Sequence, residues 1–231
     1  MRSIRAITLD LDDTLWDIEP VIIRAEKKLW AWLEEHYPRM RENWSSDRLI
    51  ELRNSIAEEF PDKTHDFRFL RKRTLAAVAI DAGYTEDLVE PAFSVFDTAR
   101  NEVDLHHDVE EVLHWLGEHY RVVAVTNGNA NLATIGIDHH FHGIVTSVGV
   151  GVAKPHPDIF VEAVRQCGVS AEEILHVGDH PETDVAGAKN AGLRTAWMNR
   201  RDYEWPEEHA HPDVTIASMS ELRALLEAAR G

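Results

Sequence analysis

The sequence predicts an α/β protein in which a doubly wound, mostly parallel sheet forms a Rossmann-like core that carries an inserted all-helical domain. Short apolar runs alternate with helical patterns at the start of the chain and again after about residue 120. Between these two regions the pattern is helical throughout, without a strand signal. Alternating strands and helices are typical of doubly wound folds. We therefore expect a core made of residues 1–16 and 103–231 and a helical domain over residues 17–102.

Each expected strand is a run of consecutive apolar or β-branched residues, which suits a strand buried on both faces of a parallel sheet. The runs are "IRAITLD" (4–10), "RVVAVTNG" (121–128), "GIVTSV" (143–148), "EILHVGD" (173–179), "LRTAWMN" (193–199) and "DVTIA" (213–217). The helical patterns of the core cover residues 108–120, 157–168, 184–192 and 218–229. At the start of the last one, Ser218 and Glu221 have the spacing of a capping box.

The inserted domain is expected to consist of four helices. Their patterns are "EPVIIRAEKKLWAWLEEHY" (19–37), "SDRLIELRNSIAEEF" (46–60), "DFRFLRKRTLAAVAIDAG" (66–83) and "EDLVEPAFSVFDTAR" (86–100). Aromatic residues recur inside these patterns and are expected to form the core of the domain. The basic stretch "RFLRKR" (68–73) is expected to be a solvated helix face, with contact to an anionic or polyhydroxylated substrate as the alternative.

Charge and composition exclude several classes of protein. Lys and Arg total 24 against 41 Asp and Glu, a formal net charge of −17, which argues against nucleic acid or an anionic membrane surface as a partner. The single cysteine, Cys167, allows no intramolecular disulfide and is expected to be a buried small hydrophobe. The first apolar run is too short for a signal peptide and is interrupted by Asp10, and no apolar stretch has transmembrane length, so we expect a soluble, cytoplasmic protein. The sequence leaves the oligomeric state open.

Polar residues close the expected strands at the points where a parallel sheet binds its ligands. These residues are Asp10 and Asp12, Thr126 and Asn127, and Asp179, and Lys154 follows the 143–148 strand after a short loop. The carboxyl ends of parallel strands meet at one edge, so distant parts of the chain should converge there. We expect the carboxylates to bind a divalent cation, and one of them to attack an anion that Lys154, Thr126 and backbone amides hold.

Four ordered motifs carry a resemblance to a known superfamily. They are "DLDDT" (10–14), "TNG" (126–128), "KP" (154–155) and "GDHPETD" (178–184). Together they resemble the haloacid dehalogenase-like superfamily, and the resemblance extends over the whole chain. The helical insertion stands at the place of that family's type 1 cap.

The resemblance implies a phosphatase that works through an aspartyl phosphate. Asp10 would be the nucleophile, and Asp12 would protonate the leaving oxygen and then activate water. Thr126, Asn127, Gly128 and Lys154 would bind the phosphate. Asp10, the carbonyl of Asp12 and Asp179 would bind Mg²⁺, with Asp184 either as a further ligand or as a support for the ligands.

The residues agree chemically with these roles, because oxygen ligands suit a hard cation and a nearby cation lowers the repulsion between a carboxylate and a phosphate. We expect Lys154 to be an exposed lysine at the sheet edge, so that its replacement impairs turnover far more than folding. Most of the 14 histidines are expected at the surface, including His180 in its loop.

Other functions stay open within the superfamily and outside it. A haloacid dehalogenase also uses an aspartate nucleophile but needs no metal, so Asp12, Asp179 and Asp184 would have no task. A phosphomutase would share every motif. A phospho-accepting receiver domain, the alternative outside enzymes, would be about half as long and would lack the insertion.

The expected substrate is a small phosphorylated metabolite. "DLDDTLWD" (10–17), "WLEEHYP" (32–38) and "AVTNGN" (124–129) are most similar to the phosphatases that act on FMN and on 5-amino-6-(5-phosphoribitylamino)uracil in riboflavin biosynthesis. Phosphoglycolate and nucleotide or sugar phosphates are the alternatives.

Overall fold

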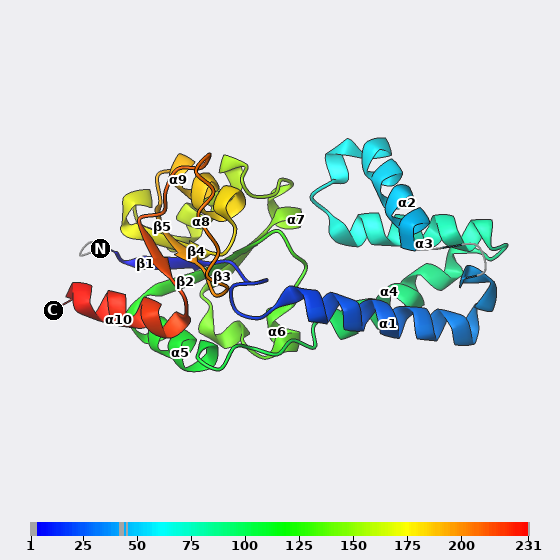
Figure 1. Cartoon of the computed structure of the whole chain (residues 1–231), viewed down its shortest axis with the longest axis horizontal. Helices are drawn as coiled ribbons and strands as arrows, with labels where there is room; N and C mark the ends of the chain where they lie inside the picture. Colours follow the sequence, from blue (N-terminus) through cyan, green and yellow to red (C-terminus); the bar gives the residue numbers. More distant parts are fainter. Residues whose placement is uncertain (1–3, 42–43, 45, 231) are drawn as a thin grey trace. The chain divides into compact units, whose positions relative to one another are not determined.

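The chain forms two compact units, which we call the core unit and the helical unit. The computed structural model describes residues 4–41, 44 and 46–230 (Figure 1). The core unit comprises Met1–Asp17 and Asp104–Gly231, and the helical unit comprises Ile18–Val103. The chain thus leaves the core unit after residue 17 and returns to it at residue 104.

The core unit is built on one six-stranded sheet in which every neighbouring pair of strands is parallel. The strand order is β3-β2-β1-β4-β5-β6. The strands are β1 (Ala6–Leu9), β2 (Arg121–Thr126), β3 (Gly143–Thr146), β4 (Ile174–Gly178), β5 (Arg194–Met198) and β6 (Val214–Ile216). The central strands β1 and β4 are buried along their whole length, as their mostly apolar sequences favour. The predicted parallel α/β fold is confirmed.

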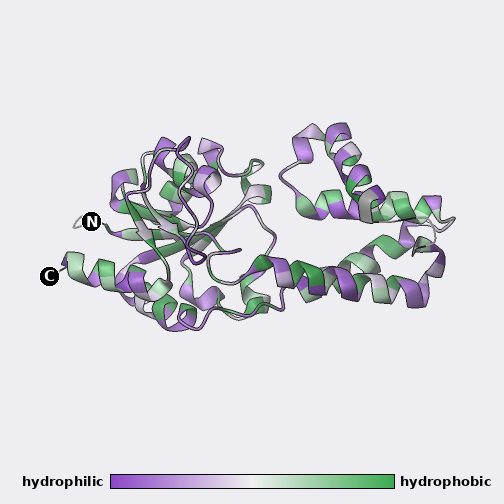
Figure 2. Ribbon diagram, viewed as in Figure 1, coloured by the Kyte–Doolittle hydropathy of each residue, from purple (hydrophilic) through white to green (hydrophobic). Residues whose placement is uncertain are grey.

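Helices cover both faces of this sheet. They are α5 (Val109–His119), α6 (Leu132–Ile135), α7 (Ser147–Val150), α8 (Pro157–Cys167), α9 (Gly187–Asn190) and α10 (Met219–Arg230). Figure 1 shows α8 and α9 on one face and α5 and α10 on the other. Cys167 is buried at the end of α8, as expected. The strands are mostly hydrophobic, whereas the helices carry hydrophobic and hydrophilic residues side by side (Figure 2).

Three local expectations differ from the structure. The predicted helix over 184–192 is a six-residue π-helix, Pro181–Ala186, followed by the short α9. The predicted strand over 143–148 ends at Thr146, because the Thr146 hydroxyl accepts a hydrogen bond from Gly149 N and starts α7. Before α10, Ser218 Oγ accepts from Glu221 N, but the Glu221 carboxylate accepts from Ala217 N and not from Ser218 N.

The helical unit contains α1 (Ile18–His36), α2 (Ser46–Glu59), α3 (Phe67–Asp81) and α4 (Val89–Arg100), with short 3₁₀ turns at Pro38–Arg41, Pro61–Lys63 and Glu86–Leu88. Helix α1 buries Val21, Ala25, Leu29 and Leu33, which are spaced four residues apart on one face. Phe93 and Phe96 of α4 belong to the same apolar cluster. No helix among the described residues is long and apolar enough to cross a membrane.

The basic stretch of α3 is not uniformly solvated, in contrast to the expectation. Arg71 lies over the Phe96 ring at 3.5 Å and donates to Glu26 at 2.7 Å, with 16% of its side chain exposed. Glu26 also accepts a hydrogen bond from Arg53. The guanidinium therefore belongs to the polar margin of the helical unit's own core, where cation–π and ionic contacts stabilise it.

Candidate active site

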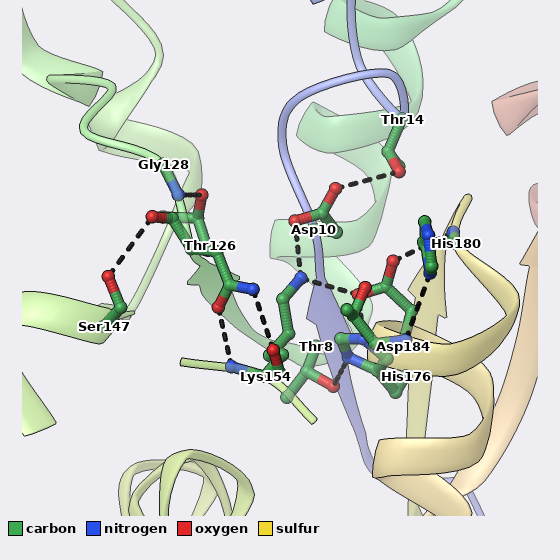
Figure 3. Close-up of polar contacts among 12 residues, drawn as sticks. Thr8, Asp10, Thr14, Thr126, Gly128, Ser147, Lys154, His176, His180 and Asp184 are labelled. Carbon is green, nitrogen blue, oxygen red and sulfur yellow. Dashed lines mark hydrogen bonds and ion pairs between the residues drawn. The ribbon is translucent and has the colours of Figure 1, made fainter. Parts of the chain in front are cut away.

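The proposed nucleophile, Asp10, lies buried at the carboxyl end of β1. Its backbone N–H donates to Val177 O at 2.9 Å, which continues the pairing with β4 beyond Leu9. Asp10 is only 6% exposed. The hydroxyl of Thr14 donates to Asp10 Oδ2 at 3.4 Å (Figure 3). The backbone of Asp10 is thus fixed by β4, and its carboxylate is oriented by Thr14.

The Asp12 carboxylate points elsewhere. Its Oδ1 accepts a hydrogen bond of 3.0 Å from the indole Nε1 of Trp16. The turn that allows this places Asp13 in the left-handed region at φ 61° and closes with Leu15 N donating to Leu11 O. Asp12 is not among the carboxylates that gather at the sheet edge. The two neighbouring acids therefore have different surroundings, as the sequence suggested.

Lys154 occupies the centre of the site. Its Nζ donates to Asp10 Oδ1 and to Asp184 Oδ1, each at 2.6 Å (Figure 3). The expectation of an exposed lysine is wrong, because Lys154 is only 4% exposed and forms a buried ion pair with both acids. Asn127 fixes its backbone: Asn127 Nδ2 donates to Lys154 O at 3.0 Å, and Lys154 N donates to Asn127 Oδ1 at 2.7 Å.

The loop after β2 lies next to this lysine. Gly128 N donates to Thr126 Oγ1 at 2.8 Å, and Ser147 Oγ donates to Asn127 O at 3.2 Å. Because the Thr126 oxygen accepts from Gly128, its own O–H is available as a donor. The Asn127–Lys154 hydrogen bonds join this loop to the acidic group. Of the expected phosphate-binding residues, Asn127 is therefore bound directly to Lys154, and Thr126 and Gly128 are bound to each other beside it.

Three carboxylates form a candidate cation site. Asp10, Asp179 and Asp184 each offer an oxygen, and these oxygens lie within 4.8 Å of one another. Hard oxygen donors in this number suit Mg²⁺, which usually keeps several waters beside one or two carboxylates. The Asp184 carboxylate packs against Gly178, where an added Cβ would lie only 2.3 Å from Asp184 Cγ. A residue with a side chain there would displace the third carboxylate.

Burial and mutual repulsion control the ionisation of these acids. Burial, with the nearby charges of Asp184 and Asp12, raises the pKa of Asp10 to about 7 against the opposing effect of Lys154. Burial, Asp184 and Asp10 raise the pKa of Asp179 to about 8. Burial acts in the same direction on Asp184, but Lys154 and His176 hold the pKa of Asp184 below its ordinary range. Ionisation of all three acids at once is therefore unfavourable in the protein alone.

His176 belongs to the site although the sequence analysis assigned it no role, and it is one of two buried histidines among the described residues, whereas most of the others are at least partly exposed, as expected. Its Nε2 lies 3.2 Å from Asp184 Oδ1, and its Nδ1 lies 2.8 Å from Thr8 Oγ1. A carboxylate only accepts, so Nε2 donates to Asp184 and Nδ1 accepts from Thr8. Burial lowers the pKa of His176. A histidine inside the apolar strand "ILHVG" was the available signal.

The π-helix supports the same carboxylate from the other side. His180 N donates to Asp184 Oδ2 at 3.0 Å, while the exposed His180 ring accepts from Glu182 N and Thr183 N. The ring therefore caps the π-helix and is exposed, as expected for a loop histidine. Single π-helical turns are frequent at functional sites.

Comparison with known proteins agrees with this architecture. The family model of the haloacid dehalogenase-like hydrolases matches residues 4–192. The chain is 30% identical to the 5-amino-6-(5-phospho-D-ribitylamino)uracil phosphatase YigB of Escherichia coli, over 98% of each chain. It is 32% identical to a glyceraldehyde 3-phosphate phosphatase of Methanopyrus kandleri, over 98% of this chain and 97% of that one. A crystal structure described as a 2-haloacid dehalogenase from Pseudomonas syringae is 36% identical, with a TM-score of 0.92 over 97% of this chain and 99% of that one.

The chain therefore belongs to the haloacid dehalogenase-like hydrolases. The resemblance found in the sequence is confirmed, as is the enzyme class, a phosphatase of this family.

Proposed function

We propose that this chain is a Mg²⁺-dependent phosphomonoesterase that works through an aspartyl phosphate on Asp10. The observation that carries the proposal is the position of Lys154 Nζ, 2.6 Å from both Asp10 Oδ1 and Asp184 Oδ1 at the carboxyl edge of the sheet. A buried ammonium between a nucleophilic carboxylate and a cation-binding carboxylate is suited to neutralise a phosphoryl group during transfer.

In the first step, a carboxylate oxygen of Asp10 attacks phosphorus while the bond to the leaving oxygen breaks. Lys154, the Thr126 hydroxyl and the backbone amide of Asn127 hold the phosphoryl oxygens, and Gly128 orients the Thr126 hydroxyl through its own N–H. Asp12 gives its proton to the leaving oxygen, so that an alcohol departs and not an alkoxide. In the second step, Asp12 takes a proton from water, which attacks the phosphorus and frees Asp10.

The carboxylates of Asp10, Asp179 and Asp184 would hold Mg²⁺, together with the backbone carbonyl of Asp12. When bound, the cation neutralises charge on the phosphoryl group and aligns it with the nucleophile. Asp12 is suited to proton transfer because its carboxylate faces the Trp16 indole and lies outside the three-acid group.

We propose a small phosphorylated metabolite as the substrate, with 5-amino-6-(5-phosphoribitylamino)uracil and FMN as the first candidates. The similarity to the Escherichia coli enzyme over 98% of both chains supports this choice. Glyceraldehyde 3-phosphate is the second candidate, because the archaeal relative covers this chain equally well. The first choice would place the reaction in riboflavin biosynthesis.

Dehalogenation is the competing reaction, and the 36% identity to the Pseudomonas protein favours testing it. Displacement of a halide by a carboxylate needs neither a proton donor for the leaving group nor a metal. Asp12 and the three-acid group would then have no chemical task, although the acids raise one another's pKa and are costly to bury. We therefore favour phosphate transfer.

One experiment separates these reactions. Purified protein is incubated with a panel of phosphomonoesters that includes both riboflavin-type substrates, glyceraldehyde 3-phosphate and phosphoglycolate, and separately with 2-chloropropionate, each with Mg²⁺ and with EDTA. We expect phosphate release only with Mg²⁺ and no chloride release. Chloride release in EDTA, or undiminished phosphate release in EDTA, would overturn the proposal, and recovery of an isomeric phosphate in place of free phosphate would indicate a mutase.

A further inference from the structure

Arg200, which no motif singles out, is bound to the loop that carries both proposed catalytic acids. It follows β5 at the same edge of the sheet as Asp10 and Asp179, and it lines a small cleft of about 80 Å³ together with Asp13 and Asp179. Its Nε donates to the backbone oxygen of Thr14 at 3.1 Å. The Thr14 hydroxyl in turn donates to Asp10. The guanidinium thus holds the 10–17 loop through its backbone.

The other end of the guanidinium reaches a second segment. Arg200 Nη2 lies 3.6 Å from Asp108 Oδ1, and the side chains of Arg200 and Asp108 are 14% and 3% exposed. Both atoms are buried and have no hydrogen-bond partner among the described residues, so each is the other's compensating charge. Asp108 is itself fixed, because its Oδ2 accepts from Ser220 N at the start of α10 at 2.9 Å.

The two segments held by Arg200 are the ones that lead out of the core unit and back into it. The chain leaves after residue 17 and returns at residue 104. His106 N donates to Leu15 O at 3.0 Å, which pairs the segments directly. Arg201 binds the outer end of the first segment through Asp17 at 2.9 Å, but this pair is about half exposed. Arg200 is the buried member of this connection.

We propose that Arg200 is a positioning residue: it fixes the 10–17 loop against the 104–108 segment and thereby sets the geometry of Asp10 and Asp12. The catalytic part of this statement rests on the proposed function. A planar guanidinium donates from Nε to a carbonyl and faces a carboxylate with Nη2, two separate nitrogens in a fixed geometry, which the single nitrogen of a lysine does not reproduce. A displacement of the loop by about 1 Å would lower turnover by up to ~100-fold, because transfer depends on aligned reacting atoms.

The test compares Arg200→Ala, Arg200→Lys and Asp108→Asn with Arg194→Ala as the matched control. Arg194 begins β5 at the opposite end of the strand, is exposed and pairs with Asp213. Asp108→Asn keeps an acceptor for Ser220 N and removes only the charge that faces Arg200. The first measurement is amide hydrogen exchange by mass spectrometry. We expect faster exchange in peptides covering 10–17 and 104–108, with α8 unchanged.

The second measurement is steady-state kinetics, with and without added guanidinium chloride well below denaturing concentrations. We expect kcat to fall by roughly 10- to 100-fold in Arg200→Ala and Arg200→Lys with KM nearly unchanged, and a partial return of kcat when guanidinium is added to Arg200→Ala. Arg194→Ala should match the wild type in both measurements. A purely stabilising role would leave kcat of the folded variants intact and would show no rescue.

The outcomes separate this inference from the proposed function. If the wild type hydrolyses no phosphomonoester, the proposed function fails, whereas exchange in the two segments still decides whether Arg200 holds them. Wild-type exchange in both segments of the Arg200 variants overturns the inference. Faster exchange in these segments together with a normal kcat in the folded Arg200 variants also overturns it, because Arg200 would then stabilise the loop without positioning the acids. Should Arg200→Ala not fold, Arg200→Lys and Asp108→Asn provide the same exchange measurement.

Discussion

Replacing Lys154 by methionine should destabilise the protein as well as inactivate it. Methionine keeps most of the length of the side chain and removes the charge that compensates Asp10 and Asp184 at 2.6 Å each. Removing one member of a buried ion pair costs about 3–5 kcal/mol, because the remaining charge stays buried without a partner. For a chain of this size, 1 kcal/mol corresponds to roughly 2–4 °C, so the expected fall in melting temperature is roughly 6–20 °C.

The loss should depend on pH with a definite sign. In the wild type, burial raises the pKa of Asp10 to about 7 although Lys154 opposes it, so the variant's carboxyl pKa values lie higher still. A group whose pKa is raised on folding stabilises the folded state at low pH and loses this contribution as pH rises through the folded value. The variant should therefore be more destabilised at pH 8 than at pH 6. Turnover should fall by at least ~100-fold, as on removal of a transition-state donor.

Thermal melts of EDTA-treated protein at both pH values measure this effect, with phosphate release as the activity assay. Lys189→Met is the control, because Lys189 is a partly exposed lysine of α9 that pairs with Asp213 at 3.8 Å and should contribute at most about 1 kcal/mol. The reasoning would be refuted if Lys154→Met lowered the melting temperature no more than Lys189→Met does, and by the same amount at both pH values. The ammonium would then not be the charge that holds the acids together.

Three further predictions concern the acids. In EDTA, the wild-type melting temperature should fall as pH rises through the raised pKa values of Asp10 and Asp179, about 7 and about 8. Mg²⁺ should raise the melting temperature most at high pH, because both acids are ionised there. Asp12→Asn should release a burst of about one nitrophenolate per enzyme from a nitrophenyl phosphate and then turn over slowly, because the amide cannot activate water. Gly178→Ala should weaken Mg²⁺ binding by roughly 10-fold or more, because the new Cβ lies 2.3 Å from Asp184 Cγ.

Each of these predictions has a contrary result. A melting temperature in EDTA that rises between pH 6 and 9 would contradict the raised pKa values. Equal, burst-free losses on alkyl and nitrophenyl esters would remove Asp12 from proton transfer. Gly117→Ala is the control for Gly178→Ala, since a Cβ at Gly117 in α5 meets only His140 O at 3.7 Å. Unchanged Mg²⁺ binding in both glycine variants would mean that Asp184 is free to move aside.

The sequence was sufficient for the sheet and for most of the site, because both depend on local patterns. Strands buried on both faces are mostly apolar, so β1, β2 and β4 are visible as short hydrophobic runs in the sequence. Parallel strands bring their carboxyl ends together, so polar residues that follow them converge whatever their separation along the chain. Asp10 and Lys154 are 144 residues apart and form a hydrogen bond.

The burial and orientation of individual side chains were harder to predict from the sequence, because they depend on contacts between distant parts of the chain. Nothing local distinguishes the buried Lys154 from an exposed lysine, and the error about its exposure follows from that. Likewise, Arg71 lies in a basic run but packs on Phe96 of another helix. His176 was visible as a histidine in an apolar strand, but its partner Asp184 comes from the π-helix that the periodicity did not predict.

The charges of the site show why one lysine does not complete it. Asp10, Asp179 and Asp184 would carry three negative charges when ionised, and Lys154 supplies one positive charge, which leaves two in excess. In the protein alone, burial and the repulsion between the acids raise the pKa of Asp10 to about 7 and that of Asp179 to about 8. Protons can therefore neutralise the two negative charges that Lys154 does not compensate. A divalent cation would replace those protons charge for charge and leave Asp10 ionised. A buried site with two uncompensated negative charges therefore favours binding of a divalent cation, and the bound cation would keep the nucleophile Asp10 ionised.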